Sequence, residues 1–491
     1  MVSLPRAAQQ LPDESPALPP LARLLQAVSP ARRALLLRLH ESVAGDGARG
    51  TVAAGLLRNL DDNPAFVAWL QRLATELGDR PLEVFLRDLI VKHAVEGHRR
   101  RLACLERHGF FGPHTVVINP TMKCNLRCAG CYAAGFARGP HMDYDLLRKV
   151  LGEARELGVH FVTVSGGEPF LYPHLERMAE EFDDVVFMVY TNATLLDAER
   201  VARLERLGNL WPAISVEGFA GETDRRRGPG VYDAVLRAMR LLRAAGVMFG
   251  FSATPTRENG DLLADDGFLD HWLERGVLFG WMFQYLPLGR DPDVDLMATP
   301  AQRDRLRAAT RRWGLTRPIF VGDFWNDGAC VGGCLSASKY CYVATDGAVQ
   351  PCTFVPFATH NVRDHSLVEV FTSPLFRAIR AAQPYDPNLL RSCKIIDRPE
   401  CLRAIVATTG ARPTYPGADA IVRHPAVTAH LDRYAREWAR LSDAAWRTDS
   451  YREGRSVVMP FLGRIDVNDL WPERMARAGT RSLHPTAQNH D

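Results

Sequence analysis

Three cysteines stand close together early in the chain, in the segment Cys124-Asn-Leu-Arg-Cys128-Ala-Gly-Cys131. Three thiolates on one short loop can hold three irons of a cubane iron–sulfur cluster, and no fourth cysteine lies nearby to complete the set. A zinc site would need four closed ligands, and His114 and His141 do not make the usual paired spacing. Buried thiols without a ligand are the other alternative. The spacing predicts a cluster with one open iron.

Further polar residues follow apolar runs later in the chain. They are the turn Ser165-Gly166-Gly167-Glu168-Pro169, the step Tyr190-Thr191-Asn192, the segment Ser215-Val216-Glu217-Gly218, and Arg227 twelve residues after Ser215. Taken alone, the glycine pair indicates a turn. Asp224 to Arg227 would similarly be a solvated charge run, and its three consecutive arginines leave the register open by one.

A second group of six cysteines lies between residues 330 and 401. Between Cys334 and Cys352, the segment YVATDGAVQP predicts a hairpin with Asp346-Gly347 at its turn, which would bring these two cysteines together. A zinc site made by Cys330, Cys334, Cys341 and Cys352 is an alternative that satisfies four-coordination.

The elements that must position these residues are short β-branched and aromatic runs separated by helix-length segments. They lie at 115–119, 161–165, 185–191, 213–217, 247–254 and 279–286. This alternation predicts parallel β/α units, in which chemistry sits at the carboxyl ends of the strands. The predicted fold class is α/β, a partial six-unit barrel of the TIM type with a helical N-terminal domain and a cysteine-rich C-terminal domain.

Five regions are predicted along the 491 residues. Residues 1–112 form a helical domain, with helix starts at Asn63-Pro64 and at Asp79 to Pro81. Residues 113–320 form the barrel, and residues 321–405 the cysteine-rich domain. A helical region at 406–475 and a tail at 476–491 complete the chain.

Composition limits the functional class. The formal net charge is only +3, so no nucleic-acid partner is expected. The N-terminal segment lacks the apolar core of a signal peptide, and the absence of any bilayer-spanning apolar run predicts a cytoplasmic protein. Ten cysteines in that compartment favour metal binding over disulfides. The basic segment HRRRLACLERH at 98–108 could contact a membrane surface, although a solvated helix face is the simpler interpretation.

The CxxxCxxC spacing after a first strand, followed one β/α unit later by GGEP, resembles the radical S-adenosylmethionine (SAM) superfamily. The resemblance implies that Cys124, Cys128 and Cys131 bind a four-iron, four-sulfur cluster whose open iron chelates SAM. Reductive cleavage of SAM gives a 5′-deoxyadenosyl radical, which abstracts hydrogen from an unactivated carbon. A low-potential electron donor such as flavodoxin or ferredoxin is the implied partner.

The same resemblance assigns cofactor contacts. Gly166, Gly167, Glu168 and Pro169 correspond to the segment whose backbone and carboxylate bind the methionine ammonium group. Asn192, Ser215 and Arg227 resemble strand-end residues of anaerobic sulfatase maturases and their relatives, in which the Ser and the Arg bind the SAM carboxylate. The family usually has an aromatic residue before the third cysteine, where this chain has Gly130, and Tyr132 just after it is expected to contact the cofactor.

The later cysteines resemble the opening of SPASM and twitch domains, which carry auxiliary iron–sulfur clusters. One further four-iron cluster is therefore expected on Cys334, Cys352 and Cys393. Its fourth ligand would be Cys330, Cys341 or Cys401, or none. An open iron could bind substrate, whereas a closed cluster would move an electron.

Three functions follow from these features. The first is an enzyme acting at an unactivated carbon–hydrogen bond of a small metabolite or a lipid, by oxidation or carbon–carbon bond formation. The second is a SPASM-type maturase of peptides or proteins, although the helical N-terminal region shows no strand-rich module for gripping a leader peptide. The third is a non-catalytic electron carrier or sensor, which would have no use for a methionine-binding set.

Overall fold

The computed structural model describes residues 63–289, 292–448, 456–459 and 463–466. Its central sheet has nine strands in the order β7-β6-β5-β4-β3-β2-β1-β8-β9. All neighbours pair in parallel except β8 and β9, which are antiparallel. The strands are β1 Thr115–Ile118, β2 Phe161–Val164, β3 Val186–Thr191, β4 Leu210–Val216, β5 Gly250–Ala253, β6 Phe279–Met282, β7 Phe320–Asp323, β8 Tyr340–Val343 and β9 Val349–Gln350.

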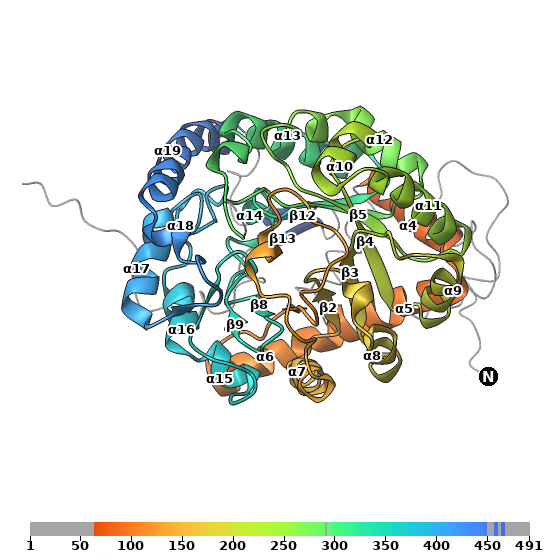
Figure 1. Cartoon of the computed structure of the whole chain (residues 1–491), viewed down its shortest axis with the longest axis horizontal. Coiled ribbons are helices and arrows are strands. Elements are labelled where there is room, and N and C mark those ends of the chain that lie inside the picture. Colours follow the sequence, from red (N-terminus) through yellow and green to blue (C-terminus); the bar gives the residue numbers. More distant parts are fainter. Residues whose placement is uncertain (1–62, 290–291, 449–455, 460–462, 467–491) are drawn as a thin grey trace, which may run out of the picture.

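Helices cover the outer face of this sheet, and Figure 1 shows them as a ring around the strands. Alternate strand residues such as Val116 and Ile118 pack into the large core beneath the helices. Thr299 begins α13 with a capping box that includes Gln302. The helices that follow successive strands are α7 Tyr144–Glu156, α8 Leu175–Glu181, α9 Ala198–Leu207, α10 Ala220–Arg227, α11 Val231–Ala244, α12 Asp266–Glu274 and α13 Pro300–Thr316.

The architecture confirms the predicted α/β fold class with a partial barrel. Each of the six predicted runs overlaps a strand, although β4 begins at Leu210, before the predicted run at 213–217, and two further strands, β7 and β8, join the parallel sheet. Within the described residues β7 and β8 do not pair with each other, so the barrel stays open between them. The hairpin expected after residue 340 is also present, with Val343 opposite Val349 and Gly347 in a left-handed conformation at φ 91°.

The expected boundary between barrel and cysteine-rich domain falls inside β7. Moreover, β8 of the cysteine-rich region lies beside β1, with Cys341 opposite Val116. The two regions therefore share one hydrogen-bonded sheet, although the division of the chain into domains stays a prediction. The short elements of this region are α14 Gly328–Val331, β10 Phe357–Ala358, α15 Leu367–Phe371, α16 Pro374–Ala381, α17 Pro399–Thr409, β11 Arg412–Pro413 and α18 Ala420–Arg423.

The C-terminal helix α19 Pro425–Thr448 packs against α13. Trp438 on α19 lies under the buried Arg303 guanidinium at 4.1 Å and donates to the Leu390 carbonyl at 3.0 Å. The expectation that helix continues to residue 475 is wrong, because β12 Ser456–Met459 and β13 Gly463–Asp466 pair antiparallel. The two valines of β12 favour a strand. The predicted tail at 476–491 lies outside the described residues.

The helices before β1 close the amino-terminal end of the barrel. They are α4 Pro64–Glu76, α5 Asp79–Val84, a π-helix Phe85–Glu96 and α6 Gly97–His108. Phe66, Trp69 and Phe85 pack against Met188 and Trp211 on the inner face of β3 and β4. The helix start at Asn63-Pro64 is confirmed, since the Asn63 side chain accepts from the Phe66 amide at 3.1 Å. None of the described helices is long and apolar enough to cross a bilayer.

Three histidines, His93, His98 and His114, are half-buried where these helices meet β1 and β2. Burial, with the nearby charge of Arg101, lowers the pKa of His98 to about 4 and lowers the pKa values of His93 and His114 as well. The His93 and His114 rings lie 6.4 Å apart. These histidines are therefore neutral in the folded protein at neutral pH.

We expect acid to destabilise the fold through this cluster. Between pH 6.5 and about 4 the unfolded chain binds protons at His98 that the folded chain does not, so stability is present above this window and is lost as pH falls. The lowered pKa of His98 alone should reduce the free energy of unfolding by about 1 to 2 kcal/mol between pH 7 and pH 5. Urea unfolding of His98→Asn should show a smaller loss over this range, whereas His424→Gln, at an exposed position, should match the wild type. An unchanged pH dependence in His98→Asn would contradict this origin.

Candidate functional site

The loop after β1 holds the first three cysteines, and the structure brings their thiols together. All three are partly exposed. Burial is the main cause of the raised pKa of Cys124, and the neighbouring charges of Cys128 and Cys131 raise it further. The Cys124 sulfur also accepts from the Leu126 amide at 3.4 Å.

The end of α10 clamps this loop from the other side. The Ala129 amide donates to the Arg226 carbonyl at 3.0 Å, and Arg226 Nε donates back to the Ala129 carbonyl at 3.1 Å. The charges of Arg227 and Arg226 also oppose the effect of burial on the Cys128 pKa. Partly exposed thiols beside guanidinium groups suit anionic sulfur, so the loop fits a cluster held by three thiolates.

The glycine pair after β2 packs directly under the cysteine loop. A Cβ on Gly166 would collide with the Thr121 carbonyl, and one on Gly167 would collide with the Lys123 carbonyl. Gly166 also has a φ of 127°, which other residues rarely adopt. The Gly167 and Glu168 amides donate to the same two carbonyls at 2.9 and 2.8 Å. The two glycines thus allow β2 to hold the loop by backbone hydrogen bonds.

The Glu168 carboxylate is fully buried and already has protein partners. It accepts from the Phe170 amide at 3.1 Å, the Thr191 hydroxyl at 2.8 Å and the Asn192 amide at 2.8 Å. Burial raises the pKa of Glu168, and these hydrogen bonds act against that rise. The carboxylate therefore joins the ends of β2 and β3 in this structure, and its contact with the methionine ammonium group stays a prediction. Pro169 is buried and begins the short 3-10 helix Pro169–Leu171.

Asn192 connects the end of β3 with the residue after Cys124. Its Nδ2 donates to Asn125 Oδ1 at 2.9 Å, and Asn125 Nδ2 donates to the Thr194 hydroxyl at 2.8 Å. The Thr194 hydroxyl donates back to Asn192 Oδ1 at 2.6 Å. Asn192 is therefore close to the cysteine loop, as expected, but its side chain closes a ring of hydrogen bonds within the protein.

At the end of β4, Ser215 is half-buried and Glu217 is buried. Glu217 accepts from Arg227 Nε at 2.9 Å and lies 2.6 Å from Arg226 Nη1. Burial would lower the pKa of Arg227, but the charge and hydrogen bond of Glu217, together with the charges of Cys128 and Cys131, raise it overall. Arg226 and Arg227 both lie at the site, so both registers of the arginine run place an arginine beside Glu217. The Glu217 carboxylate was not among the predicted site residues.

Tyr132 points into the protein, and its hydroxyl lies 2.8 Å from the Ser165 hydroxyl. Burial raises the pKa of Tyr132 to about 12. Gly130, which replaces the family's aromatic residue, has a φ of 61°, and a Cβ there would lie 2.7 Å from the Tyr285 ring. Tyr285, which follows β6, therefore packs where a larger residue 130 would stand. The sequence offered no signal for this contact, which joins residues 155 positions apart.

A cavity of about 680 Å³ opens between the cysteine loop, α10 and the segment after β6. Cys128 and Arg227 are the two predicted site residues that line it. Its other lining residues are Asn125, Leu126, Arg127, Ala129, Gly130, Arg225, Arg226, Gly228, Tyr285, Asp293 and Leu296.

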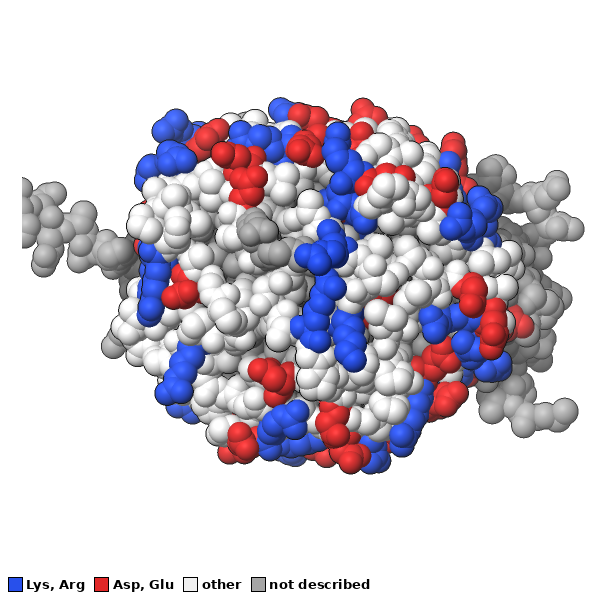
Figure 2. Space-filling model, viewed as in Figure 1, with Lys and Arg blue, Asp and Glu red and all other residues white. Residues whose placement is uncertain are grey.

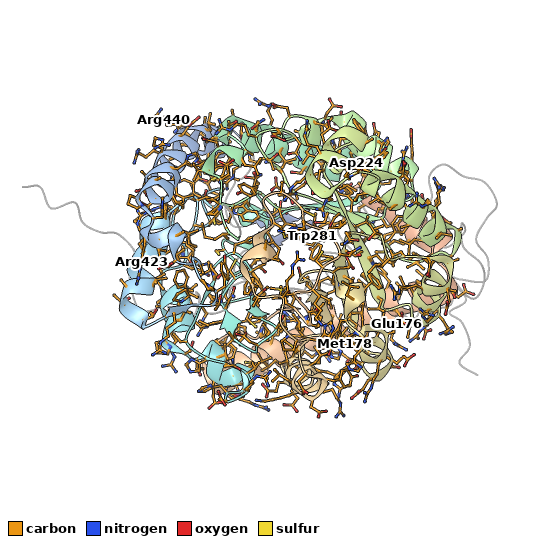
Figure 3. The ribbon with its side chains drawn as sticks, in the orientation of Figure 1. Glu176, Met178, Asp224, Trp281, Arg423 and Arg440 are labelled. Carbon is orange, nitrogen blue, oxygen red and sulfur yellow. The ribbon has the colours of Figure 1, made fainter. Side chains whose placement is uncertain are left out.

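Aromatic side chains cover the inner face of the barrel above the N-terminal helices. Phe283 lies 5.5 Å from Tyr190, 5.3 Å from Phe324 and 6.4 Å from Phe354 in ring centroid distance. Trp281 stacks on Phe283 at 6.0 Å, and Figure 3 places it near the middle of the ring of helices. All of these residues except Phe354 are only partly buried. The carboxyl ends of β3, β6 and β7 thus present an apolar wall.

Cys334, Cys352 and Cys393 also come together. The charge of Cys334 raises the pKa values of Cys352 and Cys393, after burial as the main cause. The Tyr340 hydroxyl donates to the Cys352 sulfur at 2.8 Å, and Lys394 Nζ lies 3.9 Å from the Cys334 sulfur. A hydroxyl and an ammonium group therefore face these thiols, which suits their thiolate forms.

The three candidate fourth ligands lie in different places. Cys341 is buried in the outer core with Val116, on the opposite face of β8 from Tyr340. Cys330 lies near Asp327 and Asp323, and burial raises its pKa. Cys401 is near the group, because the charges of Cys334, Cys393 and Cys401 all raise the pKa of Tyr385, after burial. In the described part of the chain, no three His, Cys, Asp or Glu side chains are arranged to hold a single metal ion.

Known proteins match both cysteine regions. A model of the radical SAM superfamily matches residues 118–259, and a model of SPASM, an iron–sulfur cluster-binding domain, matches residues 334–397. The chain is 25% identical to an AdoMet-dependent heme synthase of Methanosarcina barkeri, over 57% of this chain and 86% of that protein. It is 26% identical to the mycofactocin maturase MftC of Mycobacterium ulcerans, over 60% and 85%. The structure of Streptococcus suis SuiB bound to S-adenosylmethionine shares the fold, with a TM-score of 0.52, 18% identity, and coverage of 67% of this chain and 88% of that chain.

We expect Glu168→Ala to destabilise the protein strongly. It leaves the Thr191 hydroxyl and the Phe170 and Asn192 amides without their buried acceptor, at a cost of about 3 to 5 kcal/mol. Glu168→Gln should lose less, because its amide oxygen still accepts. Glu180→Ala, at an exposed position on α8, should stay within about 0.5 kcal/mol of the wild type. Denaturant unfolding measures all three, and equal stability of Glu168→Ala and Glu180→Ala would contradict this role.

Proposed function

Since the chain belongs to the radical SAM superfamily and carries a SPASM domain, we propose that it abstracts hydrogen from an unactivated carbon of a small metabolite or a lipid. It is an enzyme, and its cofactors are a four-iron, four-sulfur cluster, SAM and auxiliary iron–sulfur chemistry in the SPASM domain. The substrate and the residues that bind each cofactor are the proposed part.

Cys124, Cys128 and Cys131 are the proposed ligands of the first cluster. When bound, the cluster and SAM supply a carbon-centred radical strong enough to remove an unactivated hydrogen, which side-chain acids and bases cannot do. This chain's own residues would then hold the cofactor in place. Arg227 and Ser215 are proposed to bind the SAM carboxylate. The backbone of Gly166 and Gly167 is proposed to position the cysteine loop.

The observation that carries the substrate proposal is the aromatic wall of Tyr190, Trp281, Phe283 and Phe324. These rings stand at the strand ends where barrel enzymes do their chemistry, and they are only partly buried. A wall of this kind holds apolar groups and excludes water from a reactive radical. A hydrocarbon segment fits it better than a charged one.

Peptide maturation is the second candidate, and the similarity to mycofactocin maturase favours it. The similarity to heme synthase is equally extensive and favours a substrate that is not a peptide. The described N-terminal region is helical and packs into the barrel, so within residues 63–112 no strand-rich module is present to grip a leader peptide.

We propose Cys401 as the fourth ligand of the auxiliary cluster, with Cys334, Cys352 and Cys393. Of the three candidates, it is the one whose charge raises the pKa of Tyr385 together with the charges of Cys334 and Cys393. A closed four-cysteine cluster would exchange electrons with a low-potential donor such as flavodoxin or ferredoxin rather than bind substrate.

Iron and acid-labile sulfide analysis of anaerobically reconstituted protein should give about eight irons per chain, as two cubanes require. Cys401→Ala should leave the first cluster intact and change the electron paramagnetic resonance signal of the second. Cys330→Ala is the matched control and should leave both signals unchanged. A change in Cys330→Ala without one in Cys401→Ala would reverse the ligand assignment.

Reduced, reconstituted protein should cleave SAM to 5′-deoxyadenosine, measured by chromatography with mass detection. Cys128→Ala should abolish cleavage, because it removes a ligand of the SAM cluster, whereas Cys352→Ala should keep part of it. Absence of 5′-deoxyadenosine from the wild type, with the cluster verified, would rule out the proposed function. Equal behaviour of the two variants would show that the cysteines do not form separate clusters.

A further inference from the structure

We propose that the cavity beside the cysteine loop binds the anionic head, a phosphate or a carboxylate, of an amphiphilic substrate whose hydrocarbon chain lies along the aromatic wall. This inference rests on the proposed function and narrows its substrate class. It follows from the charge of the cavity and from the apolar surface next to it.

Arginine dominates the cavity wall. Four of its lining residues are arginines, Arg127, Arg225, Arg226 and Arg227, and Asp293 is the one lining carboxylate. Figure 2 shows Lys and Arg side chains running down the middle of this face, where Figure 1 places α10 and the loop after β1. Guanidinium groups are suited to bidentate binding of phosphates and carboxylates.

Internal ion pairs account for only part of this charge. Glu217 partners both Arg226 and Arg227. Arg225 meets Glu258 at 3.5 Å, but both side chains are about 60% exposed, so the pair is weak. Arg127 is exposed and has no ion pair or side-chain hydrogen bond with another described residue. Arg127 and Arg225 are therefore available to a ligand.

The cluster and SAM together would not neutralise Arg127 and Arg225. Three thiolates on an oxidised cubane give a net charge of about −1. SAM carries a sulfonium, an ammonium and a carboxylate group, for a net charge of about +1, so the two cancel. The positive charges of Arg127 and Arg225 are therefore left for a second anion in the same cavity.

Apolar side chains also line the cavity. They are Tyr285, Leu126 and Leu296. Tyr285 belongs to the same buried apolar cluster as Phe354, against which Phe283 packs. The proposed ligand would place its anionic end between the arginines and its hydrocarbon chain on the Tyr285 side of the cavity, which is the side of the aromatic wall. An acidic peptide would use the arginines as well, but it would place polar backbone against these rings.

The test measures binding by calorimetry on reconstituted protein without SAM, so that failure of SAM cleavage would remove the proposed function without affecting this result. The probes are dodecyl phosphate and the neutral dodecyl maltoside, each below its micelle concentration. We expect dodecyl phosphate to bind at least about tenfold more tightly. The double variant Arg127→Gln/Arg225→Gln should lose about that factor for dodecyl phosphate alone. Arg240→Gln, at an exposed position on α11, is the control and should change neither affinity.

Flotation with vesicles identifies the source of the anionic head. Arginine-dependent binding to phosphatidylcholine vesicles containing phosphatidylglycerol indicates a membrane lipid, and binding of monomeric dodecyl phosphate alone indicates a free phosphorylated compound. Both outcomes support the inference. Equal affinity for the two detergents, or an unaffected double variant, would overturn it. Arginine-dependent binding of a short polyglutamate without binding of dodecyl phosphate would also overturn it, in favour of a peptide.

Discussion

The site depends on the buried carboxylate of Glu168. Its three hydrogen bonds fix the ends of β2 and β3 to each other. The backbone amides of Gly167 and Glu168 also donate to the carbonyls of Thr121 and Lys123, just before the first cysteine. A buried carboxylate is costly unless each oxygen has a donor, so this arrangement has little freedom to shift. The cysteine loop is therefore placed by hydrogen bonds from two strands and from α10, rather than by the loop's own sequence.

The sequence predicted the cysteine groups, the strand-end residues and the parallel sheet, because each leaves a local signal in residue type or spacing. It did not predict how the polar residues would be used. Glu168 and Asn192 bond within the protein, and Tyr132 points inward to Ser165. Such partners are far apart along the chain, so no spacing rule reports them. Strand β7 was missed because only two of its four residues, Phe320 and Val321, favour a strand, and the other two are a glycine and an aspartate.

The charged and the apolar side chains of the site lie at the same end of the barrel. The cysteine loop, the arginines and the aromatic rings all lie toward the carboxyl ends of the strands. Phe66, Trp69 and Phe85 fill the opposite end. Under the proposed function, a substrate would therefore enter from the carboxyl ends of the strands, because the opposite end is filled.

The pairing of β8 with β1 makes the second cysteine group part of the barrel. Cys352 follows the β8–β9 hairpin and Cys124 follows β1, so the separation of the two cysteine groups is set by neighbouring strands with fixed register. The C-terminal region is consequently no exchangeable module. Removing it would strip a neighbour from the strand that leads to the first cysteine loop, and grafting a foreign domain would require rebuilding that edge of the sheet.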